Sequence, residues 1–373
     1  MAGDYIARVS EQGRGGAWHP RGPGLLLAVV TLSVVALVAH TVLAFTVWHS
    51  AAVAAPSPSA AGPATAQTPA APGAAPLHLS HSCLVADNPP TTAKVPADDA
   101  FGADLSHFGT GAELQRLYAV KDAALVPIDG AGPVRDCDQQ LWQVVVETTP
   151  ARLLTELDEF MVFDADLHSS SDGAFVGEVE PRPTGSPQDP DAARDSDHWR
   201  LAIAPNGATD VEVAITVAHE IGHLLSLNGG QLDPAQSPSG DGCETFDTGD
   251  GCLSDDSLLL AYLDDTWSQD LVDEWYQAFQ IDDDTKRLAA LQSFHDKHAD
   301  LFVSSYAATD PAEDFAESFA FWCAIGPGSP LLADVVEGDA SNGHTKLAWM
   351  DDPANRVAPE QLPDCQRLRA LTS

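Results

Sequence analysis

Apolar side chains occupy almost every face of residues 209–229, TDVEVAITVAHEIGHLLSLNG. Their recurrence at three- and four-residue intervals predicts one helix that is buried in the middle of a domain. Thr209 and Glu212 have the spacing of an N-terminal capping box, and Gly229 predicts a left-handed stop at the other end. Both ends of this helix are therefore predicted from the sequence.

The chain before this helix mixes strand-like and helix-like patterns. Apolar and β-branched runs predict three strands, at residues 141–147, 173–181 and 198–205. Two short helices are predicted, one near residues 111–120 and one after Pro150 over residues 152–160.

The chain after the helix is predicted to be a loop at 231–253 followed by two amphipathic helices at 255–279 and 284–302. Their aromatic residues are expected in the core of a helical subdomain, namely Trp267, Trp275, Tyr276, Phe279 and Phe294. A small sheet, one buried helix and a helical C-terminal part together predict the α+β fold class.

The N-terminal part differs in character, because residues 25–48 carry no charge and are almost wholly apolar. At about 1.5 Å per residue this run crosses a hydrocarbon core of about 30 Å. Arginines precede it and acids dominate after it, so the positive-inside rule places the N-terminus in the cytoplasm. The predicted organisation is a cytoplasmic tail at 1–23, a transmembrane signal anchor at 24–48, a linker at 49–80 and an extracytoplasmic domain at 81–373. A cleaved signal peptide, which would leave a secreted protein, stays open as the alternative.

The linker contains an Ala/Pro-rich tract at 51–76 that cannot bury a core and is expected to stay extended.

The net charge of the chain limits its possible partners. The whole chain of 373 residues holds 55 acidic and 18 basic side chains, a net charge of −37. Such a surface repels phosphate backbones, so no nucleic-acid partner is expected.

All six cysteines follow the linker. They are Cys83, Cys137, Cys243, Cys252, Cys323 and Cys365. An even count outside the membrane predicts three disulfides among 15 possible pairings. The short Gly- and Asp-rich loop between Cys243 and Cys252 makes that pair the first expectation, and no C-x-x-C spacing supports a zinc–thiolate site.

Three polar residues interrupt the apolar helix: His219, Glu220 and His223. Residues four apart lie one turn above each other, so both imidazoles can reach one ion with Glu220 beside it. This H-E-x-x-H spacing is typical of zinc sites in which the glutamate acts as general base. The alternative is a pair of histidines that only pack inside a core.

A catalytic zinc site needs a third protein ligand. The metzincin pattern would require Gly at 226 and His at 229, where Ser226 and Gly229 stand, so that class is excluded. A glutamate from a second helix is the other solution, and Pro311 opens such a helix with Glu313 and Glu317 on one face. Small residues at 316 and 320 keep that face slim. The alternative is an ordinary capping box, in which the residue at 310 caps the helix and Glu313 reaches back to it.

Two other polar clusters favour solvated positions over metal ligation. The acids Asp164, Asp166 and Asp172 lack the regular register of a calcium loop. His295 and His298 lie three apart on a helix with charged neighbours and are expected to be solvated.

The motif HEIGH, together with Tyr306 seven residues before Glu313 in YAATDPAEDFAE, resembles the gluzincin metallopeptidases. The similarity is greatest to the group containing anthrax lethal factor and the Pro-Pro endopeptidase, and to uncharacterised bacterial zinc-peptidase-like proteins with a membrane or lipid anchor. It covers about residues 140–325 and is specific at the two motifs. Two positions depart from the thermolysin-type pattern: Ala312 replaces an Asn, and Glu317 replaces the Asp that orients a ligand histidine.

This resemblance implies a zincin-like domain and a role for each motif residue. His219, His223 and Glu313 become the zinc ligands, Glu220 the general base and Tyr306 the oxyanion-stabilising hydroxyl. Glu317 becomes the residue that orients a ligand histidine.

The function expected from the sequence is therefore a zinc-dependent metalloendopeptidase that cleaves peptide or protein substrates outside the cytoplasmic membrane. The alternative is a non-catalytic binding or scaffold protein of the cell envelope on a zincin-like fold.

Overall fold

The computed structural model describes residues 113–128, 133–164, 176–183, 194–205, 209–236, 243–248, 251–327, 343–352 and 364–372, with positions 79, 83, 329 and 355. The predicted signal anchor and nearly all of the predicted linker lie outside these residues. Within them, none of the helices has the length and apolarity that a membrane crossing requires.

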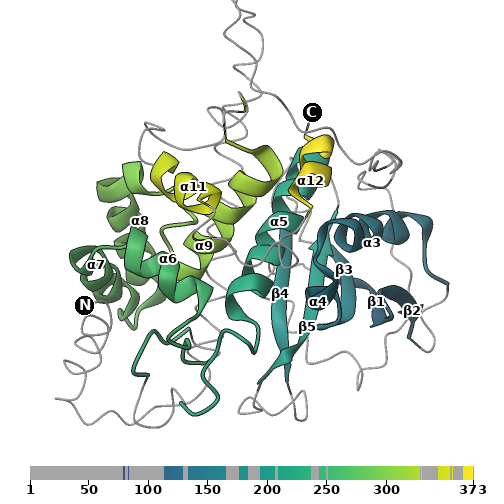
Figure 1. Ribbon diagram of the computed structural model, residues 1–373, viewed down its shortest axis with the longest axis horizontal. Coiled ribbons are helices and arrows are strands. Elements are labelled where there is room, and N and C mark those ends of the chain that lie inside the picture. Colours follow the sequence, from purple (N-terminus) through teal and green to yellow (C-terminus); the bar gives the residue numbers. More distant parts are fainter. Residues whose placement is uncertain are drawn as a thin grey trace, which may run out of the picture.

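A five-stranded sheet forms one side of the molecule, and most of the helices gather on the other (Figure 1). Its strand order is β2-β1-β3-β5-β4, with β3 and β5 parallel and the other neighbours antiparallel. The strands are β1 (Glu113–Lys121), β2 (Ala124–Pro127), β3 (Leu157–Asp164), β4 (Val176–Pro183) and β5 (Arg194–Ala204). The sheet therefore ends in β2 on one side and in β4 on the other.

The β1–β2 hairpin turns through two residues with positive φ, Asp122 at 52° and Ala123 at 58°. Two consecutive positive values give the turn the twist that suits a tight hairpin. Trp142 donates its indole N–H to the carbonyl of Ala123 over 2.9 Å, which fixes the turn against α3 (Asp136–Thr148).

The predicted strand at 141–147 is wrong, because these residues lie within α3. Over the full element the buried positions recur at helical spacing: Asp138, Leu141, Trp142, Val144, Val145 and Thr148. A seven-residue apolar window fits both a strand and a buried helix, and only the longer pattern separates them.

The predicted helix near 111–120 is also wrong, because residues 113–120 lie in β1. Arg116 is buried there, 3% exposed, and places its guanidinium on the fully buried carboxylate of Asp138, with Nη2 to Oδ1 at 2.8 Å. Tyr118 donates to the same carboxylate over 2.6 Å. A charged residue at a buried strand position hides the alternation that identifies a strand.

The predicted helix at 152–160 is largely wrong, because only the single turn α4 (Ala151–Leu154) is helical. The chain then enters β3, where Phe160, Val162 and Phe163 are completely buried. Residues 159–163 are all buried, so both faces of β3 are covered and its apolar run shows no alternation.

The predicted strands at 173–181 and 198–205 are confirmed as β4 and β5. The buried helix is confirmed as α5 (Asp210–Leu227), and the capping box of Thr209 and Glu212 is present. The left-handed stop is wrong, because Gly326 is the glycine with positive φ among the described residues. Instead, extended Asn228 ends α5 and donates its side-chain amide to the carbonyl of Leu224 over 2.6 Å.

The helical part follows α5 along the chain. Its elements are α6 (Leu258–Thr266), α7 (Gln269–Phe279), α8 (Asp284–His298), η4 (Ala299–Leu301), α9 (Pro311–Ala320), η5 (Phe321–Ile325), α11 (Gly343–Asp351) and α12 (Cys365–Leu371). The helix predicted at 255–279 is two helices, because Trp267 is extended and Ser268 caps α7. Trp267, Trp275 and Phe294 are core residues as predicted, whereas Tyr276 is 42% exposed.

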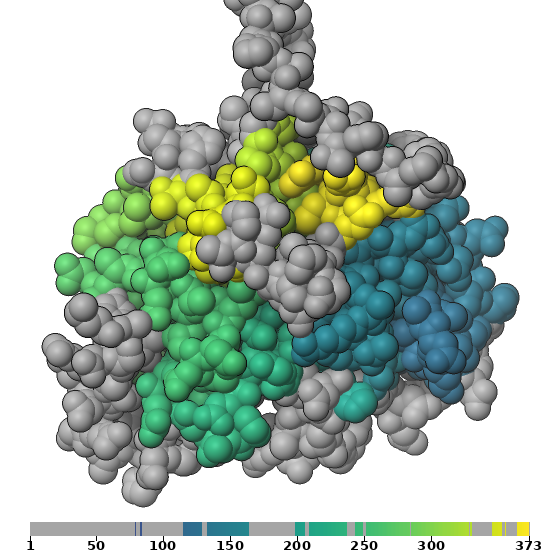
Figure 2. Space-filling model, viewed as in Figure 1, coloured from purple at the N-terminus to yellow at the C-terminus, as the bar shows by residue number. Residues whose placement is uncertain are grey.

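On the face shown in Figure 2, the sheet side and the helices α6 to α8 lie on either side, and the C-terminal helices, in yellow, lie between them along the upper part of the molecule. Helix α12 packs on α5 and α3, and α11 packs on α9 and α6. The C-terminal segment thus joins the two sides of the molecule over the buried helix.

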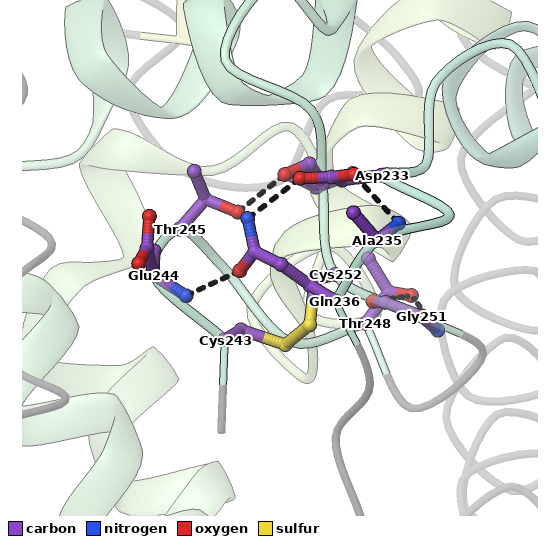
Figure 3. Close-up of a disulfide and its surroundings, with 10 residues drawn as sticks. Asp233, Ala235, Gln236, Cys243, Glu244, Thr245, Thr248, Gly251 and Cys252 are labelled. Atoms are coloured by element: carbon purple, nitrogen blue, oxygen red, sulfur yellow. Dashed lines mark hydrogen bonds between the residues drawn. A yellow bond between two sulfur atoms is a disulfide. The ribbon is translucent and has the colours of Figure 1, made fainter. Parts of the chain in front are cut away.

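Three disulfides are present, as predicted, and they pair Cys83–Cys137, Cys243–Cys252 and Cys323–Cys365. Figure 3 shows the second pair, which closes part of the loop after α5. Gln236 braces this loop by donating to Asp233 over 2.7 Å and accepting the backbone N–H of Glu244 over 2.6 Å. The mixed α+β class is confirmed, with a small sheet and a mainly helical second half.

Candidate metal centre

Two helices that pack against each other supply the centre. Helix α5 carries His219 and His223 one turn apart, and α9 carries Glu313 and Glu317 one turn apart. The capping box of α5 and the N-terminal Pro311 of α9 set where each helix starts.

His219, His223 and Glu313 converge on one point and can hold a metal ion. The Nε2 atoms of the two imidazoles lie 3.0 Å apart, and each lies 3.2 Å from Oε2 of Glu313. Ligands at about 2.05 Å in an ideal tetrahedron lie about 3.3 Å from one another, so this triangle has nearly the size of a tetrahedral face. Two imidazoles and one carboxylate also leave a fourth position open, as in catalytic zinc sites.

The side chain of Glu313 does not take the position that the capping-box alternative requires. Asp310 caps α9 by accepting the backbone N–H of Ala312 over 2.8 Å. The side chain of Glu313 turns instead toward the two imidazoles. The carboxylate of Glu313 is therefore available as a ligand.

Glu317 is not part of the ligand triangle but contacts one of its histidines, His219. Its Oε1 lies 2.9 Å from Nδ1 of His219, so the carboxylate accepts the Nδ1 proton. That contact leaves the lone pair of Nε2 of His219 facing Glu313 and His223, which is the tautomer a metal ligand needs.

The electrostatics favour a cation between these groups. Burial alone would lower the pKa of His219, but hydrogen bonds to Glu313 and Glu317 raise it well above its ordinary value. Burial would raise the pKa of Glu313, but the charges and hydrogen bonds of the two imidazoles hold it well below its ordinary range. Burial raises the pKa of the neighbouring Asp310 to about 7. A proton or a metal ion is thus stabilised at the point where the side chains meet.

Glu220 and Tyr306 lie beside the triangle. Glu220 is 3% exposed, and its charge contributes to raising the pKa of both His219 and Tyr306. The Tyr306 ring lies 5.8 Å from the His219 ring. Burial, with the charge of Glu313 and a hydrogen bond to it, raises the pKa of the Tyr306 hydroxyl well above its ordinary value. The hydroxyl therefore stays protonated and can donate.

Close packing of α5 on α9 brings the ligands together. A Cβ placed on Gly222 would lie 2.9 Å from the Cα of Ala316 and 3.4 Å from its Cβ. The slim face predicted around residue 316 is confirmed, whereas the matching role of Gly222, inside the HEIGH motif, was not predicted. Two small residues facing each other across two predicted helices are the signal that would have identified it.

A buried ion pair holds a second face of α9. Asp314 is fully buried and accepts from Tyr262 over 2.9 Å, from Trp267 over 2.8 Å and from Lys346 over 2.5 Å. Burial raises the pKa of Asp314 and lowers that of Lys346, and the pair opposes both shifts. With Asp314 anchored to α6 and α11, the neighbouring Glu313 points toward α5. Sequence reasoning missed this pair, because a charged residue beside a ligand gives no sign that it is buried.

The other polar clusters do not join the centre. His295 is buried rather than solvated, at 8% exposure, and His298 lies 3.0 Å from Glu274. Of the acid cluster, Asp164 ends β3, while Asp166 and Asp172 lie outside the described residues. Among the described residues, the group of His219, His223 and Glu313 is the metal-binding candidate.

Comparison of the chain with protein-family models, with curated proteins and with solved structures found no match. The chemistry of this centre is therefore assigned from its own residues.

Proposed function

We propose that the protein is a zinc metallopeptidase that hydrolyses peptide bonds. The observation that carries the proposal is the meeting of Glu313 with the two imidazoles of an H-E-x-x-H helix at about the spacing of tetrahedral ligands. The acidic side chain Glu220 and the protonated hydroxyl of Tyr306 beside them supply the remaining parts of a gluzincin-type site.

Zinc held by His219, His223 and Glu313 would supply Lewis acidity, polarising a substrate carbonyl and lowering the pKa of a water molecule to about 7. Glu220 takes the proton of the attacking water and passes it to the leaving amine. Tyr306 donates its hydroxyl to the oxygen on which negative charge develops. Glu317 keeps His219 in the required tautomer throughout.

An extended peptide substrate fits the edge strand β4. The strand just before α5, β5, cannot offer such an edge, because it pairs with β3 on one side and β4 on the other. Among the described strands, the edge next to α5 belongs to β4, which also packs against that helix. Backbone pairing with an edge strand binds a peptide with little dependence on its sequence, and this makes β4 the substrate-binding strand in our proposal.

The three disulfides support an extracytoplasmic location, because such bonds persist in oxidising compartments. Placement outside the membrane through the signal anchor at 24–48 is part of the proposal.

Metal content and peptide cleavage test the proposal in the full chain with its disulfides formed. Purified protein is expected to hold one zinc per chain, and His219→Ala with His223→Ala is expected to lose it. Glu220→Gln is expected to keep zinc and lose cleavage of a peptide library. Tyr306→Phe is expected to keep zinc and lose about 10²- to 10³-fold in kcat, the usual effect of removing one oxyanion donor. Full zinc occupancy without cleavage of any peptide would favour the non-catalytic alternative.

A further inference from the structure

One serine hydroxyl contacts both Glu317 and the turn that carries Tyr306. Ser304 donates from Oγ to Oε2 of Glu317 over 2.6 Å. The same Oγ accepts the backbone N–H of Ala307 over 3.0 Å. Ser304 therefore lies at the junction of the carboxylate that orients His219 and the turn that carries Tyr306.

The first contact fixes the carboxylate of Glu317 at both oxygens. Oε1 accepts from His219, and Oε2 accepts from Ser304. A hydrogen bond of this length to an ionised carboxylate is in the charge-assisted class. The Glu317 side chain is 13% exposed, so bulk water has little access to replace a lost donor. With Ser304 present, rotating the Glu317 carboxylate away from Nδ1 of His219 breaks two hydrogen bonds. Without the serine hydroxyl, the same rotation breaks only one.

The second contact fixes the backbone around Tyr306. Ser304 holds the N–H of Ala307 on one side of the turn. Thr309 holds the carbonyl of Tyr306 on the other, through its hydroxyl at 2.7 Å and its backbone N–H at 2.9 Å. Side chains of this kind close local turns by replacing backbone partners. The position of the Tyr306 ring beside His219 thus depends on the same hydroxyl that orients Glu317.

We propose that Ser304 is a positioning residue of the metal centre, which acts on His219 through Glu317 and on Tyr306 through the turn at 304–307. The inference rests on the proposed metal binding, and it names a residue that is not itself one of the three ligands. It predicts that one hydroxyl controls both metal affinity and the turnover that depends on Tyr306.

Zinc affinity, measured by competition with a chelating dye in the full chain, is the first readout. Loss of an outer hydrogen-bond partner of a metal ligand typically costs 10- to 100-fold in affinity, so Ser304→Ala is expected to bind zinc at least 10-fold more weakly. Ser304→Thr keeps a hydroxyl and is expected to stay within about 3-fold of wild type. Ser318→Ala is the matched control, because it removes a buried serine hydroxyl from α9 whose partner is Tyr262. Its zinc affinity is expected to be unchanged.

A double-mutant cycle with Glu317→Gln tests the route of action. If Ser304 acts through Glu317, adding Ser304→Ala to Glu317→Gln should weaken zinc binding by less than about 2-fold further. Independent 10-fold losses that multiply would overturn the inference, as would wild-type affinity in Ser304→Ala. If Ser304→Ala does not fold, Ser304→Cys, a near-isosteric weak donor, takes its place with the same criterion.

A metal-independent readout separates this inference from the proposed function. Hydrogen exchange of the Ala307 amide in metal-free protein is expected to accelerate at least 10-fold in Ser304→Ala, because its acceptor is lost. Wild-type protein that binds no zinc would defeat the proposed function. Wild-type protein that binds zinc, with no change on removing the Ser304 hydroxyl, would defeat only the inference about Ser304.

Discussion

Gly222→Ala should weaken metal binding without touching a ligand. A Cβ at this position would lie 2.9 Å from the Cα of Ala316, and that Cα belongs to the backbone of α9. Carbon atoms prefer separations of about 3.5–4.0 Å, so the two helices must move apart by about 0.6–1 Å. Because the ligands come from both helices, this movement would carry the two 3.2 Å imidazole–carboxylate separations to about 4 Å.

The expected cost appears in two measurements. Metal sites tolerate displacements of about 0.2 Å, so zinc affinity is expected to fall by at least 10-fold. Overpacking costs about 1–3 kcal/mol, against a gain of about 1 kcal/mol from replacing glycine inside a helix. Dye competition measures the affinity, and denaturant unfolding of metal-free protein measures the stability.

Ala316→Gly provides the matched control for Gly222→Ala. It changes a small residue at the same contact and costs about 1 kcal/mol of stability through helix propensity, but it does not force the helices apart. Its zinc affinity should stay near that of wild type. If Gly222→Ala binds zinc as tightly as wild type, the close approach of α5 and α9 does not set the ligand spacing.

Three further predictions concern the support of the centre. Lys346→Met leaves the buried Asp314 carboxylate without its cation and should lower the unfolding free energy by about 3–5 kcal/mol. A double variant that also carries Asp314→Asn should regain about half or more of that loss, and an equally unstable double variant would refute the ion-pair account. Replacing Cys323 and Cys365 by serine opens a 42-residue loop and should lower the unfolding free energy by about 4 kcal/mol through loop-closure entropy. Opening the nine-residue loop of Cys243–Cys252, the disulfide in Figure 3, should cost about 2.5 kcal/mol, and the reverse order in denaturant unfolding would contradict this ranking. Removing zinc with a chelator should lower the melting temperature of the wild-type protein, because a ligand that binds only the folded state stabilises it. The double variant His219→Ala, His223→Ala should show no such shift, and equal shifts in both proteins would exclude the proposed ligands.

The fold could be predicted where one pattern had one interpretation. Helix α5 followed from its length, its apolar surface and the Thr209 cap, and β5 followed from a short, mainly apolar run bounded by Pro205. Helix α3 and strand β1 could not, for opposite reasons. The run at 141–147 was too apolar to show its helical period, while the buried Arg116 made β1 look too polar for a strand.

The sequence predicted which residue types could meet, but not the contacts that bring them together. Spacing placed His219 and His223 on one turn, and chemistry demanded a third ligand. Whether Glu313 was that ligand or the far end of a capping box depended on the rotation of α9, which the sequence leaves open. The buried pair of Asp314 with Lys346, 32 residues farther along the chain, fixes this rotation.

The residues that sequence reasoning missed share one property, which is that they act on distance and orientation rather than on chemistry. Gly222 sets how closely two helices approach, and Ser304 connects Glu317 with the turn before α9. Neither contributes a group that a metal or a peptide would bind, so no motif identifies them. Because a tetrahedral site tolerates only small displacements, such residues determine whether the two motifs form one centre or remain two separate patterns.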